Sequence, residues 1–132
     1  MAYVQLVILL AVLESLLFGY AVGSARARYK VAAPAVTGHP VFECYYRVQV
    51  NTLEQLIVFL PSIVLFARYI NAWAAAALGV LFIIGRALYF RGYVQAPESR
   101  HAGFVLSAIP NVTLLSGALI GVIRAIVVSG GT

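Results

Sequence analysis

The sequence predicts an all-α integral membrane protein in which four transmembrane helices form one bundle, a single domain over residues 1–132. The first observation is composition: 63% of the residues are hydrophobic and 10% are charged, whereas a soluble domain carries about 25% charged residues. The second is that four apolar segments reach the roughly 20 residues that a helix needs to cross the hydrocarbon core. These segments cover residues 3–22, 44–70, 72–94 and 99–128.

Each segment has local features of a membrane helix. We interpret residues 3–22 as a retained helix, because no basic residue precedes them and they are longer than the apolar core of a signal peptide. The second and third segments are joined by a very short turn near Asn71, which predicts an antiparallel hairpin. Pro97 suits the start of the fourth helix, and the GxxxG step of Gly117 and Gly121 predicts close helix packing.

The charged residues indicate how the chain is oriented. Nine Lys and Arg residues outnumber four Asp and Glu residues, giving a net charge of +5. They lie near the ends of the apolar segments rather than on one face, so they favour a topology signal over nucleic-acid binding. The basic residues of the first and third connections predict that both connections are cytoplasmic and that both termini lie on the opposite side. We favour a bacterial inner membrane over the endoplasmic reticulum.

The sequence has few residues that could bind a metal ion or form a disulfide. Cys44 is the single cysteine, which excludes an intramolecular disulfide framework. The two histidines, His39 and His101, are far apart and lack the spacing of metal ligands. We therefore expect no metal site.

A polar stripe interrupts the second apolar segment. The run RVQVNTLE places Arg47, Asn51 and Glu54 on one face of a helix. Ionisable groups at membrane depth are costly unless they face a partner or a water-filled cavity. A cation, an amide and an anion in one row predict a pocket for a zwitterionic polar ligand. An Arg–Glu pair that locks two helices together is an equally open alternative.

A second polar row lies in the third segment. Arg86, Tyr89 and Tyr93 follow an i, i+3, i+7 spacing, and Arg100 comes at the start of the fourth helix. Tyrosines in membrane helices are usually interfacial anchors, but Arg86 shares the face of these two at a depth where lipid exposure would be costly. Because both rows belong to the same end of the bundle, they favour one site.

Three stretches, SARARYKV, RVQVNTLE and GRALYFRGYVQAPESR, and the spacing between them resemble the membrane-associated proteins in eicosanoid and glutathione metabolism. This resemblance implies a homotrimer of four-helix subunits with glutathione bound between adjacent subunits. It also implies an enzyme that adds glutathione, as co-substrate, to a hydrophobic electrophile dissolved in the bilayer, with peroxidase activity left open. The implied partners are glutathione, a lipid or other hydrophobic electrophile, and membrane lipids, without nucleic acid.

The resemblance implies a role in glutathione binding for eight residues: Arg26, Arg47, Gln49, Asn51, Glu54, Gln55, Tyr89 and Tyr93. The arginines would contact carboxylates, and Glu54 would receive the α-amino group. The amides at 49 and 51 would pair with the peptide groups, and the tyrosines would contact the same ligand. Gln55 departs from leukotriene-forming members of the family, which have a tyrosine there, and this leaves the identity of the thiol open.

Arg100 matches the family's catalytic arginine, which holds the sulfur as a thiolate. A free thiol has a pKa of about 8.5, so an adjacent cation is needed to supply the thiolate near neutral pH. Arginine cannot accept the proton itself, which leaves water as the acceptor.

Two alternatives stay open at this point. One is a lipid-binding protein of the same fold without chemistry, against which Arg100 argues. The other is a small proton-coupled multidrug exporter, which Glu14 in the first helix fits but the polar rows do not. As a carboxylate in hydrocarbon, Glu14 is expected to have a structural role, matched to a polar group of the bundle.

Overall fold

The computed structural model describes residues 1–130 and is almost entirely helical. Its elements are α1 (Ala2–Tyr29), α2 (Pro40–Tyr69), α3 (Ala72–Gln95), the short 3-10 helix η1 (Pro97–Arg100) and α4 (His101–Ser129). By length and composition, four helical segments can cross a membrane. This confirms the prediction of an all-helical protein with four candidate membrane spans.

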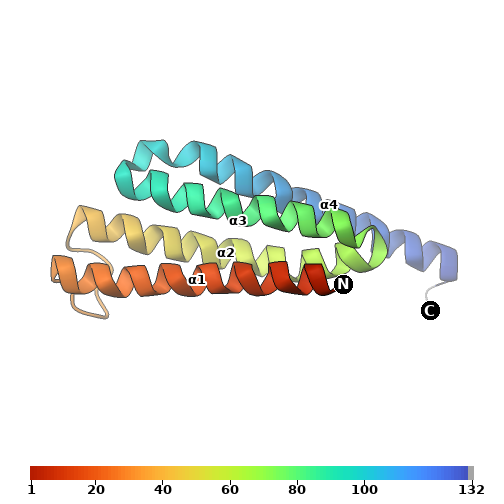
Figure 1. The fold of residues 1–132 in the computed structure, drawn as a ribbon, viewed down its shortest axis with the longest axis horizontal. Helices are drawn as coiled ribbons and strands as arrows, with labels where there is room; N and C mark the ends of the chain where they lie inside the picture. Colours follow the sequence, from red (N-terminus) through yellow and green to blue (C-terminus); the bar gives the residue numbers. More distant parts are fainter. Residues whose placement is uncertain (131–132) are drawn as a thin grey trace.

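The four long helices lie side by side along one axis and alternate in direction (Figure 1). The α1–α2 and α3–α4 connections lie at one end of the bundle. The N-terminus and the end of α4 lie toward the opposite end, together with the tight α2–α3 turn, and α4 extends past the other helices there (Figure 1). We call the end with the two connections the polar end, because both polar rows of the sequence lead toward it.

The first connection is shorter than the sequence analysis expected, because α1 does not stop at Val22. It continues to Tyr29, beyond the purely apolar residues. Alanine and arginine are both good helix formers, and the last turn holds Arg26 and Arg28, where positive charge is favourable beside the helix C-terminus. The helix ends at Lys30, which adopts a left-handed conformation with φ 57°.

The second helix also begins earlier than predicted, at Pro40 rather than Cys44. Proline is well suited to the first turn, since the backbone N–H that it lacks would have no helical partner there. The Nδ1 atom of His39 accepts a hydrogen bond from the backbone N–H of Val41 at 3.1 Å and caps the helix. Hydropathy alone misses this start, because the first turn is polar at Glu43.

Small residues let the helices approach closely. A Cβ atom on Gly85 of α3 would lie 2.8 Å from the carbonyl carbon of Leu106 in α4. One on Gly121 would lie 2.8 Å from the Cβ atom of Tyr69 in α2, and one on Gly117 would meet the ring of Phe66. The GxxxG step of α4 is therefore used for packing within the chain, against α2.

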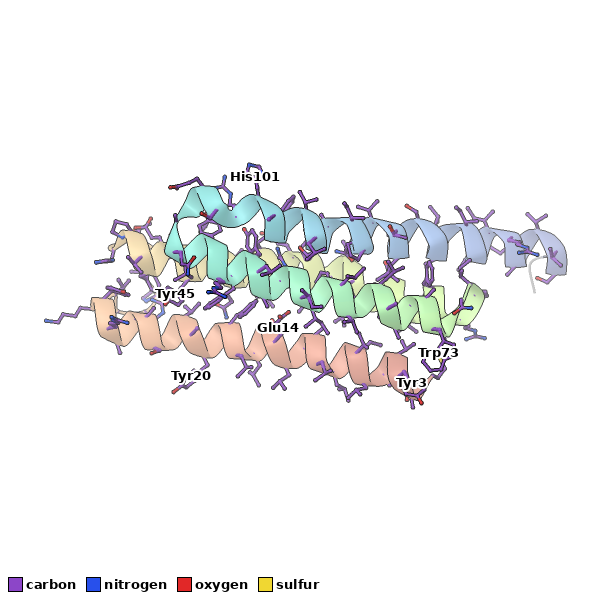
Figure 2. The ribbon with its side chains drawn as sticks, turned by 45° about the horizontal axis from the view of Figure 1, so that its top comes forward. Tyr3, Glu14, Tyr20, Tyr45, Trp73 and His101 are labelled. Carbon is purple, nitrogen blue, oxygen red and sulfur yellow. The ribbon has the colours of Figure 1, made fainter. Side chains whose placement is uncertain are left out.

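The outer surface of the bundle is apolar. Large hydrophobic side chains are exposed along α1 and α4, as expected of surfaces that face lipid. Tyr20 is 78% exposed and points away from the bundle (Figure 2). Tyr3 and Trp73 meet near the end of the bundle opposite the polar end (Figure 2). The ring centroids of this pair are 4.7 Å apart, an arrangement typical of aromatic anchors at a membrane interface.

Candidate functional site

A polar cleft lies at the polar end, between the first connection, the start of α2 and the end of α3. It has a volume of about 430 Å³ and is lined by Val36, Thr37, Pro40, Glu43, Cys44, Tyr46, Arg47 and Tyr93. Two predicted site residues, Arg47 and Tyr93, therefore face one cavity from different helices. Glu43, Cys44 and Tyr46 were not predicted. Glu43 and Cys44 lie four and three residues before Arg47, and therefore on the same face of the helix. This spacing could have predicted both residues from the sequence.

The predicted tyrosines and cations gather next to this cleft. The rings of Tyr89 and Tyr93 meet edge to face with centroids 5.5 Å apart. The guanidinium carbon of Arg100 lies 5.5 Å from the centroid of Tyr93. Tyr89 is buried and interacts electrostatically with Arg47, Arg86 and Arg100. The structure thus brings the two polar rows together, with Arg100 supplied by η1 immediately before α4 rather than by the first turn of α4.

Arg26 holds the first connection beside the cleft. Its Nη1 group donates hydrogen bonds to the carbonyl oxygens of Ala35 at 2.6 Å and Val31 at 3.4 Å. Its guanidinium carbon also lies 4.8 Å from the ring centroid of Phe42 in α2. Arg26 is therefore anchored to the connection and does not itself line the cleft.

Below the cleft, the polar rows are joined by a buried hydrogen bond. Arg86 is 0% exposed, and its Nη1 group donates to Oδ1 of Asn51 at 2.6 Å and, at 3.5 Å, to Oγ1 of Thr52. Its guanidinium carbon lies 4.3 Å from the centroid of Tyr89. Asn51 therefore has an intramolecular partner that the sequence analysis did not assign, and Thr52 joins the network.

Glu54 is placed differently from the other residues of its stripe. Its side chain is exposed on α2. Among residues 1–130 it has neither a hydrogen-bond nor an ion-pair partner, and it forms no pair with Arg47. The interpretation of the stripe as an Arg–Glu lock within one chain therefore finds no support.

Gln49 and Gln55 do not line the cleft. Gln49 lines an apolar groove of about 1020 Å³ between α1 and α2, together with residues that include Leu16, Tyr20 and Ile57. A Cβ atom on Gly19 would lie 2.9 Å from Nε2 of Gln49, so the end of this amide packs against the glycine of α1. We call this surface the apolar groove.

The family of the chain follows from comparison with known proteins. A family model described as the MAPEG family matches residues 4–120. The chain belongs to this family.

Individual MAPEG relatives support a glutathione-related transferase activity. The chain is 44% identical over 103 residues to human microsomal glutathione S-transferase 2, covering 77% of this chain and 70% of that protein. It is 35% identical over 117 residues to leukotriene C4 synthase of Bos taurus, covering 89% and 78%. An uncharacterized protein of the cyanobacterium Synechocystis sp. is 49% identical over 102 residues, covering 77% and 74%. MAPEG membership separates the chain from the small multidrug exporters that Glu14 brought into consideration.

Gln55, which the sequence analysis assigned to the glutathione site, has a partner in α4. Its side-chain Oε1 accepts a hydrogen bond from Nδ2 of Asn111 at 2.8 Å, and its backbone carbonyl accepts from the same group at 3.2 Å. Asn111 is buried, so the pair ties α2 to α4 inside the bundle. Part of the hydrogen-bonding capacity of Gln55 is therefore already used within the chain.

Proposed function

We propose that this MAPEG protein is a membrane-embedded glutathione transferase that ionises the thiol and adds it to a hydrophobic electrophile from the bilayer. The observation that carries the proposal is that Arg47 and Tyr93 line one polar cleft from different helices, while the guanidinium carbon of Arg100 in η1 lies 5.5 Å from the ring centroid of Tyr93. The likeness to human microsomal glutathione S-transferase 2 supports the same activity.

Glutathione carries two carboxylates, one ammonium group and two peptide bonds, and the proposed site residues include a group for each. Arg26 and Arg47 are the proposed contacts of the carboxylates, since arginine binds carboxylates through charge-assisted hydrogen bonds. Glu54 is the proposed acceptor for the ammonium group. Gln49, Asn51 and Gln55 are the proposed amide partners, and Tyr89 and Tyr93 the proposed phenol contacts.

Arg100 is the proposed catalytic residue. Its guanidinium would stabilise the thiolate, so that the thiol loses its proton to water near neutral pH. The thiolate sulfur then forms a bond to an electrophilic carbon, while the bond from that carbon to its leaving group or ring oxygen breaks. Since arginine stays charged throughout, its contribution is electrostatic rather than that of a general base.

We also propose that the protein works as a homotrimer with its pockets between subunits. Glu54 supports this, because an exposed carboxylate in a membrane helix calls for a partner outside its own chain. Gln49 supports it too, since it lies on a different face of α2 from the polar cleft. A second subunit that brings its apolar groove to the cleft would unite the two half-sites. The groove would then give the hydrophobic electrophile access from the membrane.

The polar end is the proposed cytoplasmic end. Arg26, Arg28 and Lys30 lie in or next to the first connection, and positively charged connections stay in the cytoplasm. Both termini would then lie on the opposite side. A bacterial inner membrane is the proposed location, in keeping with the cyanobacterial relative.

The proposal is tested by measuring the ultraviolet absorbance of the thiolate when glutathione is mixed rapidly with the protein. We expect a thiolate signal at neutral pH from the wild type and its loss in Arg100→Ala, with a smaller change in glutathione affinity. Arg124→Ala, which removes a cation near the opposite end of α4, is the matched control and should keep the signal. An unchanged signal in Arg100→Ala would exclude Arg100 as the activating residue. Glutathione binding without a thiolate signal in the wild type would favour a lipid-binding relative without chemistry.

A further inference from the structure

Arg86 is the most completely enclosed charged group in the described residues, and only one of its nitrogens is satisfied by hydrogen bonds. It is 0% exposed, with Nη1 bound to Asn51 and Thr52. Its Nε and Nη2 groups are buried without a hydrogen-bond partner among residues 1–130. A buried cation of this kind is strongly destabilising unless a nearby negative charge compensates it.

Glu14 is the acidic side chain that interacts electrostatically with Arg86. In Figure 2 its side chain points from α1 toward α3, the helix that carries Arg86. The two groups interact electrostatically, and Oε1 of Glu14 is buried without a hydrogen-bond partner of its own. No hydrogen bond joins the two groups in the described residues, so the coupling between them, across α1 and α3, is electrostatic only. We call them the Glu14–Arg86 pair.

The pair has a consequence for the orientation of Asn51. Arginine has hydrogen-bond donors and no acceptor, so the amide group can face Arg86 only with its oxygen. That oxygen is the atom found 2.6 Å from Nη1. The Nδ2 group is not among the buried unpaired atoms, and the Asn51 side chain is half-buried. Asn51 therefore presents a hydrogen-bond donor, not an acceptor, on its accessible side.

We propose that Arg86 is a positioning residue that fixes Asn51 as a donor to a carbonyl or carboxylate oxygen of the bound thiol, and that Glu14 holds Arg86 in place. This rests on the proposed function. It makes the pocket selective for thiols that offer an oxygen acceptor at this point, as a peptide thiol does. The role of Arg86 is thus indirect, exerted through the orientation of Asn51.

Asn51→Asp tests the orientation with almost no change in shape. Aspartate keeps an oxygen toward Arg86 but replaces the donor on the accessible side by a second oxygen. We expect the dissociation constant for glutathione, measured by calorimetry, to rise at least tenfold, while the melting temperature does not fall. Affinity equal to or tighter than that of the wild type would show that Asn51 offers an acceptor, and would overturn the proposal.

A double-mutant cycle tests the pair. Glu14→Gln and Arg86→Met should each lower the melting temperature, because each leaves one buried charge uncompensated. The double variant should melt well above the temperature that the two separate losses predict by addition. Its glutathione dissociation constant should nevertheless stay roughly fivefold or more above the wild-type value, since Asn51 loses the bond that orients it.

The two readouts separate positioning from simple stabilisation. Recovery of both stability and affinity in the double variant would show that Arg86 acts only as a structural charge. Additive losses of stability would show that Glu14 and Arg86 are not a pair. If the wild type bound no glutathione, the proposed function would fail and the role of Asn51 with it, whereas a positive cycle would still support the Glu14–Arg86 pair.

Discussion

Two glutamates in the membrane-spanning helices occupy opposite environments. Glu14 points into the bundle, where it interacts electrostatically with Arg86. Glu54 is exposed on α2 and has no partner within residues 1–130. Sequence reasoning predicted that both need polar neighbours, because hydrocarbon penalises any lone charge. It could not identify Arg86 as the neighbour of Glu14, since the register between α1 and α3 is decided by packing and not by the sequence of either helix.

At this scale we predict that Arg47→Ala and Glu54→Ala chiefly weaken glutathione binding. Each removes one charge-assisted hydrogen bond, a loss of about 1.5–3 kcal/mol or roughly tenfold to a hundredfold in dissociation constant. The turnover rate at saturating glutathione should change little, because these contacts are present in both ground and transition states. Calorimetric titration and steady-state kinetics give the two quantities. Arg68→Ala, near the opposite end of α2, is the control. Normal affinity with a reduced turnover rate would contradict the assignment.

The helices were predictable as elements, but not their ends. Hydropathy found all four, since about 20 apolar residues in a row are the pattern of a membrane-spanning helix. It missed the extension of α1 to Tyr29, which depends on helix propensity and on the favourable placement of Arg26 and Arg28 beside the helix C-terminus. It also left open whether Gly117 and Gly121 pack within or between subunits. A GxxxG step indicates close approach of another helix but does not identify that helix.

The contact of α3 with α4 gives a prediction at the scale of elements. A Cβ atom on Gly103 would meet the backbone of Tyr89 and lie 2.7 Å from the carbonyl carbon of Leu88. We expect Gly103→Ala to destabilise the fold by about 1–3 kcal/mol, because a backbone has to move to admit the methyl group. The melting temperature in detergent should fall. Gly23→Ala is the matched control, since its added Cβ atom has nothing within 4 Å.

These two glycine variants should move in opposite directions. Alanine is favoured over glycine inside a helix by about 0.5–1 kcal/mol, so Gly23→Ala should melt at the same temperature as the wild type or slightly higher. Gly103→Ala should also disturb glutathione binding, because Tyr89 belongs to the proposed site. Equal melting temperatures for the two variants would mean that α3 and α4 are less closely packed than the structure shows.

At the scale of the whole molecule, the candidate site is distributed over two faces of one chain. The sequence predicted that both polar rows lie at one end, and the structure brings Arg47, Tyr89, Tyr93 and Arg100 together there. Gln49 lies instead in the apolar groove. Two residues apart on a helix point in nearly opposite directions, so Gln49 and Arg47 cannot contact the same small ligand from one α2 helix. The proposed trimer resolves this by drawing the two residues from neighbouring subunits.

Mixing subunits tests this arrangement directly. In a trimer with heterologous contacts, each pocket would take Arg100 from one subunit and Gln49 from the next. Arg100→Ala and Gln49→Ala trimers should each conjugate poorly at low glutathione concentration. After dissociation and random reassembly of an equal mixture, about one pocket in four should be wild type, because its Arg100 and its Gln49 come from different subunits. About a quarter of the wild-type rate should therefore return.

The mixing experiment also tests the alternative in which each pocket is formed by a single chain. If Gln49 and Arg100 served one pocket from the same chain, every pocket in the mixture would carry one of the two changes, and no activity would return. Native mass spectrometry in mild detergent supplies the assembly readout, with mixed trimers expected and monomers or dimers alone contradicting the trimer. Recovered activity together with mixed trimers would require a pocket that spans two subunits, because in no other arrangement can two defective chains form an intact site.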